Sequence, residues 1–147
     1  MKLFAFVLAF VAGTLVTLQI ASNSKLKEAV GATIPAAIAS SLFGVILLGA
    51  AMVVMQVPWP TIDKLISAPW SAWMGGAFGA FYALVTIGLA RHLGAATLVT
   101  VIVVGQLICS VVVDHLGVLG FEARAATVAR LTGCALLLGG FLLIWRY

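Results

Sequence analysis

Five apolar stretches of about twenty residues constrain this chain more than any other feature of its sequence. They cover residues 3–22, 33–55, 70–90, 95–116 and 127–145. A helix needs about 20 mostly apolar residues to cross the roughly 30 Å hydrocarbon core of a bilayer. Because no backbone N–H can stay unpaired in lipid, each stretch is predicted to be a transmembrane α-helix. The predicted fold class is an all-α membrane protein, with five transmembrane helices in a single domain over residues 1–147.

The composition excludes several other classes of protein. Only 8% of the 147 residues are charged, whereas a soluble domain carries about 25%. The two cysteines cannot form a disulfide scaffold, and no set of residues has the spacing of a metal site. The lysines and arginines are scattered singly, so no basic stripe is present for nucleic acid to follow. We expect a lipid-embedded protein that is not an enzyme and needs no cofactor or metal.

The first apolar stretch could also be a cleaved signal peptide, because Lys2 precedes it and small residues follow. It is, however, longer than the usual apolar core of about 7–15 residues in a signal peptide, and it contains Gln19. We therefore interpret it as a membrane span.

The basic residues are divided equally between the two sides of the membrane. Five spans place the termini on opposite sides, here named side A (the N-terminal side) and side B. Side A receives Lys2, Lys64, Arg124 and Arg130, and side B receives Lys25, Lys27, Arg91 and Arg146. An excess of Lys and Arg in short cytoplasmic loops normally sets orientation. Three explanations are open: the span limits are a few residues off, the position of the charges within the loops matters more than their number, or the chain inserts both ways and assembles as an antiparallel dimer with itself or with a homologous chain.

Polar side chains fall on single faces of the predicted third and fourth spans. Gln106, Ser110 and Asp114 follow one another at intervals of four residues in the fourth span, and Tyr82 lies near the middle of the third. A buried amide without a partner costs several kcal/mol in an apolar environment. Gln106 is therefore expected either to bond another helix as structural glue or to line an aqueous cavity. Asp114 is the acidic residue that continues the stripe, and it is a candidate coupling group.

Small residues in the third and last spans indicate close helix packing. Gly75 and Gly79 form a GxxxG pattern, which lets two helix backbones approach each other. Gly133 and Gly140 lie a heptad apart in the last span. We assign these four glycines to helix packing rather than to chemistry.

Several local patterns occur together in a fixed order. They are Gly13…Gln19…Asn23…Leu26, Pro35-Ala36-Ala37…Ser40…Gly44, Trp73-Met74-Gly75-Gly76…Gly79-Ala80…Tyr82, Gly94-Ala95-Ala96, Gly105-Gln106…Ser110…Asp114-His115-Leu116-Gly117…Gly120 and Arg130…Gly133. This ordered set resembles the small YdcZ-like bacterial inner-membrane proteins of the drug/metabolite transporter superfamily. The resemblance covers nearly the whole chain. It implies a bacterial inner-membrane protein that is half of an inverted-repeat transporter, because the larger relatives contain ten spans as two inverted halves.

The expected function is transport of a small amphipathic metabolite or drug-like compound by a dual-topology dimer with alternating access. The residues expected to line the substrate pathway are Gln106, Tyr82, Ser110, Gln19, Asn23, Phe78 and Phe81, the two phenylalanines as aromatic walls. The four-span multidrug members of the superfamily depend on a membrane-embedded glutamate that this chain lacks, so their proton-coupled export of cations is not carried over. A dual-topology channel and a non-transporting subunit of a membrane assembly remain the alternatives.

Overall fold

The computed structural model describes residues 2–147 and has six helices and no strand among them. The helices are α1 (Lys2–Val30), α2 (Thr33–Val54), α3 (Ile62–Ile66), α4 (Trp70–Leu93), α5 (Ala95–Leu116) and α6 (Val128–Arg146). All except the five-residue α3 are long and apolar enough to cross a membrane. The all-helical class and the five spans predicted from the sequence are therefore confirmed. Most helix ends lie within one residue of the predicted limits.

The first helix is the main exception. The predicted first span ends at residue 22, where the polar sequence Ser22-Asn23-Ser24-Lys25 begins, but α1 continues to Val30 and contains 29 residues. At 1.5 Å per residue it is roughly 44 Å long, well beyond the roughly 30 Å of a hydrocarbon core. Helix α1 ends only at Gly31, which has a φ of +85° and is therefore in the left-handed region that favours glycine.

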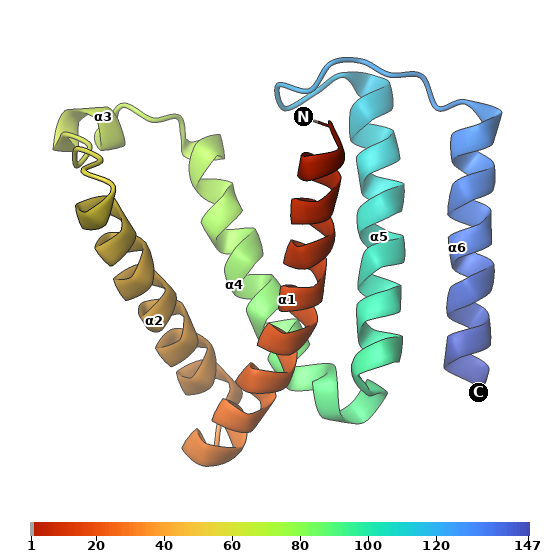
Figure 1. The fold of residues 1–147 in the computed structure, drawn as a ribbon, viewed down its shortest axis with the longest axis horizontal. Helices are drawn as coiled ribbons and strands as arrows, with labels where there is room; N and C mark the ends of the chain where they lie inside the picture. The colour runs from red at the N-terminus through yellow and green to blue at the C-terminus, as the bar shows by residue number, and fades with distance from the viewer. Residues whose placement is uncertain (1) are drawn as a thin grey trace. The chain divides into compact units, whose positions relative to one another are not determined.

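The chain divides into two compact units, and the division falls after Arg91. In the first unit α2 runs antiparallel to α1 and α4 (Figure 1). Its core is made of Ala36, Ala37 and Ile87, with Leu26 and Ala83 packed against them. Helix α2 packs most closely against α1, and Ile87 of α4 reaches the two alanines of α2. An ion pair between Glu28 and Arg91 also joins the last turns of α1 and α4.

The second unit is a helical hairpin. Helices α5 and α6 run antiparallel to each other (Figure 1) and pack side by side. Gly117, with a φ of +61°, ends α5. Thr127 begins α6 as its N-cap, since its hydroxyl oxygen accepts a hydrogen bond from the backbone N–H of Arg130.

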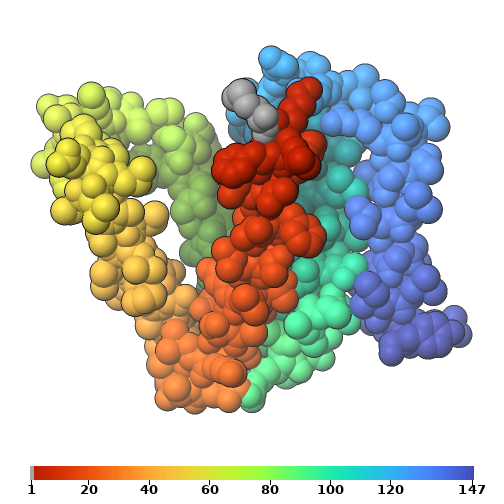
Figure 2. All heavy atoms as spheres, in the orientation of Figure 1, coloured from red at the N-terminus to blue at the C-terminus, as the bar shows by residue number. Residues whose placement is uncertain are grey.

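Large apolar side chains cover the outer faces of the helices. Phe10 is 78% exposed and Leu48 is 70% exposed. In Figure 2, no other helix of the first unit covers one face of α1. An apolar surface of this extent marks contact with lipid or with another protein rather than with water.

Candidate functional site

A cavity of about 420 Å³ lies among α1, α2 and α4 of the first unit. It is lined by Gln19, Ile20, Asn23, Ser41, Gly76, Gly79, Ala80, Tyr82, Ala83 and Thr86. Three of the predicted pathway residues, Gln19, Asn23 and Tyr82, are thus brought together here although they come from two helices far apart in the sequence. We refer to this space as the polar cavity.

The extension of α1 beyond its predicted end contributes Asn23 to the lining of the polar cavity. Asn23 and Ser24 are buried on this extra part of the helix. The hydroxyl of Ser40 in α2 donates a hydrogen bond of 2.7 Å to Oδ1 of Asn23. This bond fixes the orientation of the amide, so that its two N–H groups are the part of Asn23 that can serve a ligand.

Helix α4 supplies the opposite wall through one face. The hydroxyl of Thr86 is buried and donates to the backbone carbonyl oxygen of Tyr82 at 2.8 Å, so its proton is already used within the helix. Gly76 and Gly79 carry no side chains and leave the space beside Tyr82 open. The phenol of Tyr82 and the amide of Gln19 therefore line a space that is wide enough for a ligand.

The polar cavity is uncharged. No Asp, Glu, Lys, Arg or His is among its lining residues. Its polar groups are amides and hydroxyls, which both donate and accept hydrogen bonds. Such a lining suits an uncharged polar group better than an ion, because an ion in an apolar environment needs a compensating charge or many bonds.

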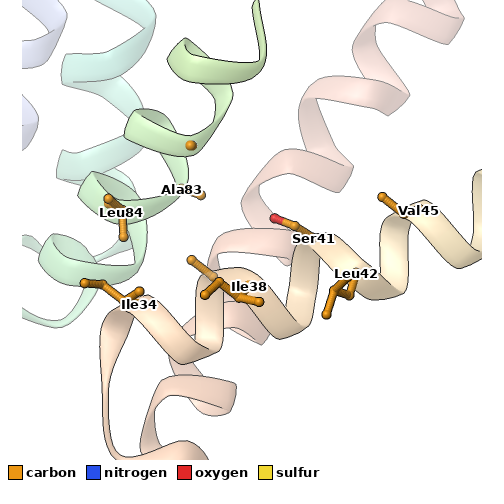
Figure 3. A pocket seen from close by; sticks show the side chains of 9 residues that line it. Ile34, Ile38, Ser41, Leu42, Val45, Ala83 and Leu84 are labelled. Atoms are coloured by element: carbon orange, nitrogen blue, oxygen red, sulfur yellow. The ribbon is translucent and has the colours of Figure 1, made fainter. Parts of the chain in front are cut away.

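A second cavity, of about 320 Å³, lies between α2 and α4 (Figure 3). We refer to it as the apolar groove. It is lined by Ile34, Ala37, Ile38, Ser41, Leu42, Val45, Ala80, Ala83 and Leu84. Ser41 is the one residue of this set with a polar side chain, and its hydroxyl points away from α2 in a different direction from Leu42 (Figure 3).

Ser41 was not among the pathway residues predicted from the sequence. The small-residue face of the second span, which includes Ala37, Ser41 and Gly44, indicates close packing as readily as a cavity wall. Which of the two it forms depends on how α2 meets α4, and that cannot be deduced from the sequence of α2 alone.

The remaining predicted pathway residues are not among those that line the polar cavity. Gln106 and Ser110 are exposed on α5 in the second unit, and the hydroxyl of Ser110 donates to the backbone oxygen of Leu107 at 2.9 Å. Phe78 and Phe81 are exposed on α4 and line neither the polar cavity nor the apolar groove. Their assignment to the pathway stays a prediction.

The four glycines assigned to helix packing have no close neighbour within their own units. A Cβ atom built on Gly75, Gly79, Gly133 or Gly140 meets no heavy atom within 4 Å, apart from its own helix and adjacent residues. Gly79 lines the polar cavity instead. Packing at these glycines therefore stays a prediction.

Asp114, the candidate coupling residue, takes part in a network that holds the α5–α6 connection. Its Oδ2 accepts a hydrogen bond of 2.7 Å from the Arg130 guanidinium, and its backbone oxygen accepts one of 2.6 Å from the N–H of Arg124. Nδ1 of His115 also accepts from the N–H of Ala126 at 3.3 Å. The Asp114-His115 segment and Arg130 thus meet in space although sixteen residues separate Asp114 from Arg130.

A comparison with protein families identifies the relatives of this chain. The family described as "Putative inner membrane exporter, YdcZ" matches residues 4–143. The chain belongs to this family. It is a multi-pass protein of the inner membrane, and its family is one of transporters rather than enzymes. No curated protein and no solved structure matches the chain significantly.

Proposed function

We propose that the chain transports a small amphipathic compound with an uncharged polar group, and that the polar cavity of the first unit is part of its binding site. The observation that carries this proposal is the lining of the cavity, where Gln19, Asn23, Ser41 and Tyr82 offer hydrogen bonds and no residue offers a charge. The volume of about 420 Å³ falls within the range of about 300–1,000 Å³ that is usual for small-molecule sites.

The working unit in this proposal is a dual-topology dimer. Four basic residues on each side of the membrane leave the orientation of the chain undecided. A five-span chain paired with an inverted copy would reproduce the two inverted halves that many transporters contain. The open faces at Gly75 on α4, and at Gly133 and Gly140 on α6, are surfaces on which a second chain could pack closely.

The proposed mechanism is alternating access, in which the two chains rock around a site near the bilayer midplane. No step in it requires a buried carboxylate. Asp114 is paired with Arg130, and the polar cavity contains no acid. Binding of the substrate would therefore rest on neutral hydrogen bonds and on apolar contact.

Counterflow in sealed vesicles tests this function. The purified protein is reconstituted and loaded with an unlabelled compound, and uptake of the labelled compound is followed for a panel of neutral amphiphiles and lipophilic cations. A carrier gives a transient, saturable accumulation that is largest for the neutral compounds. Flux far above carrier turnover would support a channel, and no flux for any compound, together with co-purification of a partner protein, would support an assembly subunit.

A variant of the cavity lining makes the same test specific. Gln19→Leu removes an amide from an exposed position, so the fold is expected to tolerate it. Counterflow should fall while the amount of folded protein in size-exclusion chromatography stays constant. Unchanged counterflow in this variant would place the site away from the polar cavity.

A further inference from the structure

The polar cavity and the apolar groove share one wall. Ser41 on α2 and Ala80 and Ala83 on α4 line both spaces. All three side chains are small, so the partition between the two cavities is only as thick as an alanine or a serine. On one side of it are the amides and hydroxyls of the polar cavity, and on the other are the side chains of Ile38, Leu42 and their neighbours.

The groove lies at the depth of the hydrocarbon core. Ser41 follows the first residue of α2 by eight residues, which is about 12 Å along the helix axis. Ala80 follows the first residue of α4 by ten residues, which is about 15 Å. Both distances are close to half the roughly 30 Å thickness of the core.

A groove at this depth faces lipid where no helix of its own unit covers it. Ile38 is 55% exposed and Leu42 is 57% exposed, so the helices of the first unit leave the outer side of the groove open. Their aliphatic side chains match acyl chains in chemistry and carry no group that would hold water there.

We infer that the apolar groove is a lateral portal, through which a single-tailed amphiphile dissolved in the bilayer reaches the polar cavity. Its uncharged head would pass over Ser41, Ala80 and Ala83 into the polar cavity, while its tail would stay in the groove and in the surrounding lipid. This inference rests on the proposed function, and it adds the route of the substrate and the shape of the molecule.

The physical advantage of a lateral portal is that the tail never leaves an apolar environment. Each methylene of an alkyl chain raises its partition coefficient from water into an apolar phase about fourfold. A route through the aqueous phase would carry that penalty for every methylene of the tail. The wall between the cavities also supplies the hydroxyl of Ser41, a donor and acceptor that the head can meet on its way.

The inference is tested with a photoactivatable probe, decanamide with a diazirine in the second half of its chain. A primary amide is uncharged and both donates and accepts hydrogen bonds, like the side chains of the polar cavity. The reconstituted protein is irradiated with the probe, and the labelled residues are located by mass spectrometry, with and without excess unlabelled decanamide. We expect labelling of Ile38, Leu42 and Leu84 that the unlabelled amide abolishes, and weaker labelling of lipid-facing Leu47 that it does not.

Two matched variants separate a portal from general contact with lipid. Ile38 and Leu47 are both 55% exposed on α2, and nine residues place them on opposite faces of the helix. Ile38→Trp fills the groove and is expected to lower the competable labelling by about fifteenfold, the loss expected when contact with two methylenes is removed. Leu47→Trp adds the same bulk toward lipid and should leave the labelling unchanged.

Three results would overturn the inference: labelling at Ile38 that unlabelled decanamide does not reduce, equal effects of the two tryptophan variants, or no labelling of the groove because a second chain covers it. Folding of each variant is checked by size-exclusion chromatography, and Ile38→Leu serves as the conservative variant if Ile38→Trp does not fold. Ile38→Leu should keep the competable labelling, and loss of labelling in this variant would also count against the portal.

Counterflow is measured on the same samples. Flux without competable labelling contradicts the portal alone, whereas competable labelling without flux for any compound contradicts the proposed function alone.

Discussion

The guanidinium of Arg130 donates a hydrogen bond of 2.7 Å to Oδ2 of Asp114, and this ion pair joins the start of α6 to the end of α5. Each charge stands at the unfavourable end of its own helix, because the C-terminal end of a helix repels an anion and the N-terminal end repels a cation. The pair compensates for both placements. Asp114 therefore has a structural role, whatever part it takes in transport.

Exchange of the two charges tests this role. Arg130→Gln and Asp114→Asn should each lower the free energy of unfolding by about 1 kcal/mol, between the values for an exposed ion pair and for a hydrogen bond to a charged group. The double variant Asp114→Arg/Arg130→Asp should recover at least half of that loss, since both charges then suit their helix ends. Thermal unfolding in detergent measures all three variants, and a double variant less stable than either single variant would contradict this explanation.

The variant Asp114→Asn also tests whether transport is coupled to protons through Asp114. If its role is structural, Asp114→Asn lowers stability but leaves the dependence of counterflow on an imposed pH gradient unchanged. Loss of that dependence, at constant folded protein, would restore Asp114 as the coupling group.

Gly117 is the residue of the α5–α6 connection least able to accept a side chain. Its φ is +61°, and a Cβ atom at this position would lie 2.8 Å from Cβ of Ala123. We expect Gly117→Ala to destabilise the protein by about 1–3 kcal/mol through backbone strain and the clash. Gly139→Ala is the matched control, because Gly139 lies inside α6 and a Cβ there meets nothing within 4 Å. The control should be neutral or slightly stabilising, and equal losses in thermal unfolding would show that strain at Gly117 is not the cause.

The sequence is sufficient to predict the helices but not how they meet. The limits of α5 were predicted without error, because a run of apolar residues between Gly94 and Gly117 leaves one position for the helix. The end of α1 was predicted eight residues too early. The polar residues 22–25 are typical of a loop at a membrane surface, yet they lie on a helix in which Asn23 and Ser24 are buried.

The candidate site was predictable only in part for the same reason. The faces that carry Gln19, Asn23 and Tyr82 follow from helical periodicity, and these three residues do line one cavity. The contribution of Ser41 depends on the approach of α2 to α4, which is set by packing among Ala36, Ala37 and Ile87. Such contacts between distant segments leave no trace in the periodicity of either helix.

Tyr82→Phe measures what one hydroxyl of the polar cavity contributes to binding. The change removes a single hydrogen-bonding group and keeps the ring, so the loss should be about 0.5–1.5 kcal/mol, or about tenfold or less in affinity. Ligand titration on protein of known folded fraction gives this value. Because the helices keep their packing, thermal stability should not change.

Gln106→Leu provides the comparison in the second unit. If Gln106 is structural glue, this variant is less stable and binds ligand normally. If Gln106 lines the pathway, binding is lost and the amount of folded protein is preserved. Unaltered affinity in both Tyr82→Phe and Gln106→Leu would move the pathway away from these faces of α4 and α5.

The equal division of basic residues predicts that the chain inserts in both orientations. We expect reporters at each terminus, or single cysteines labelled from one side, to be found on both sides of the membrane. Thr61→Lys and Ser67→Lys together add two positive charges to the exposed connection between α2 and α4 on side A, and they should shift most chains to the orientation with side A inside. Transport should fall at the same time, because an antiparallel dimer needs both orientations.

Thr61→Gln with Ser67→Gln is the neutral control and should leave both orientations populated. A chain found in one orientation without a partner chain, or an orientation that ignores the added lysines, would contradict dual topology and leave the four-against-four division of charge without consequence.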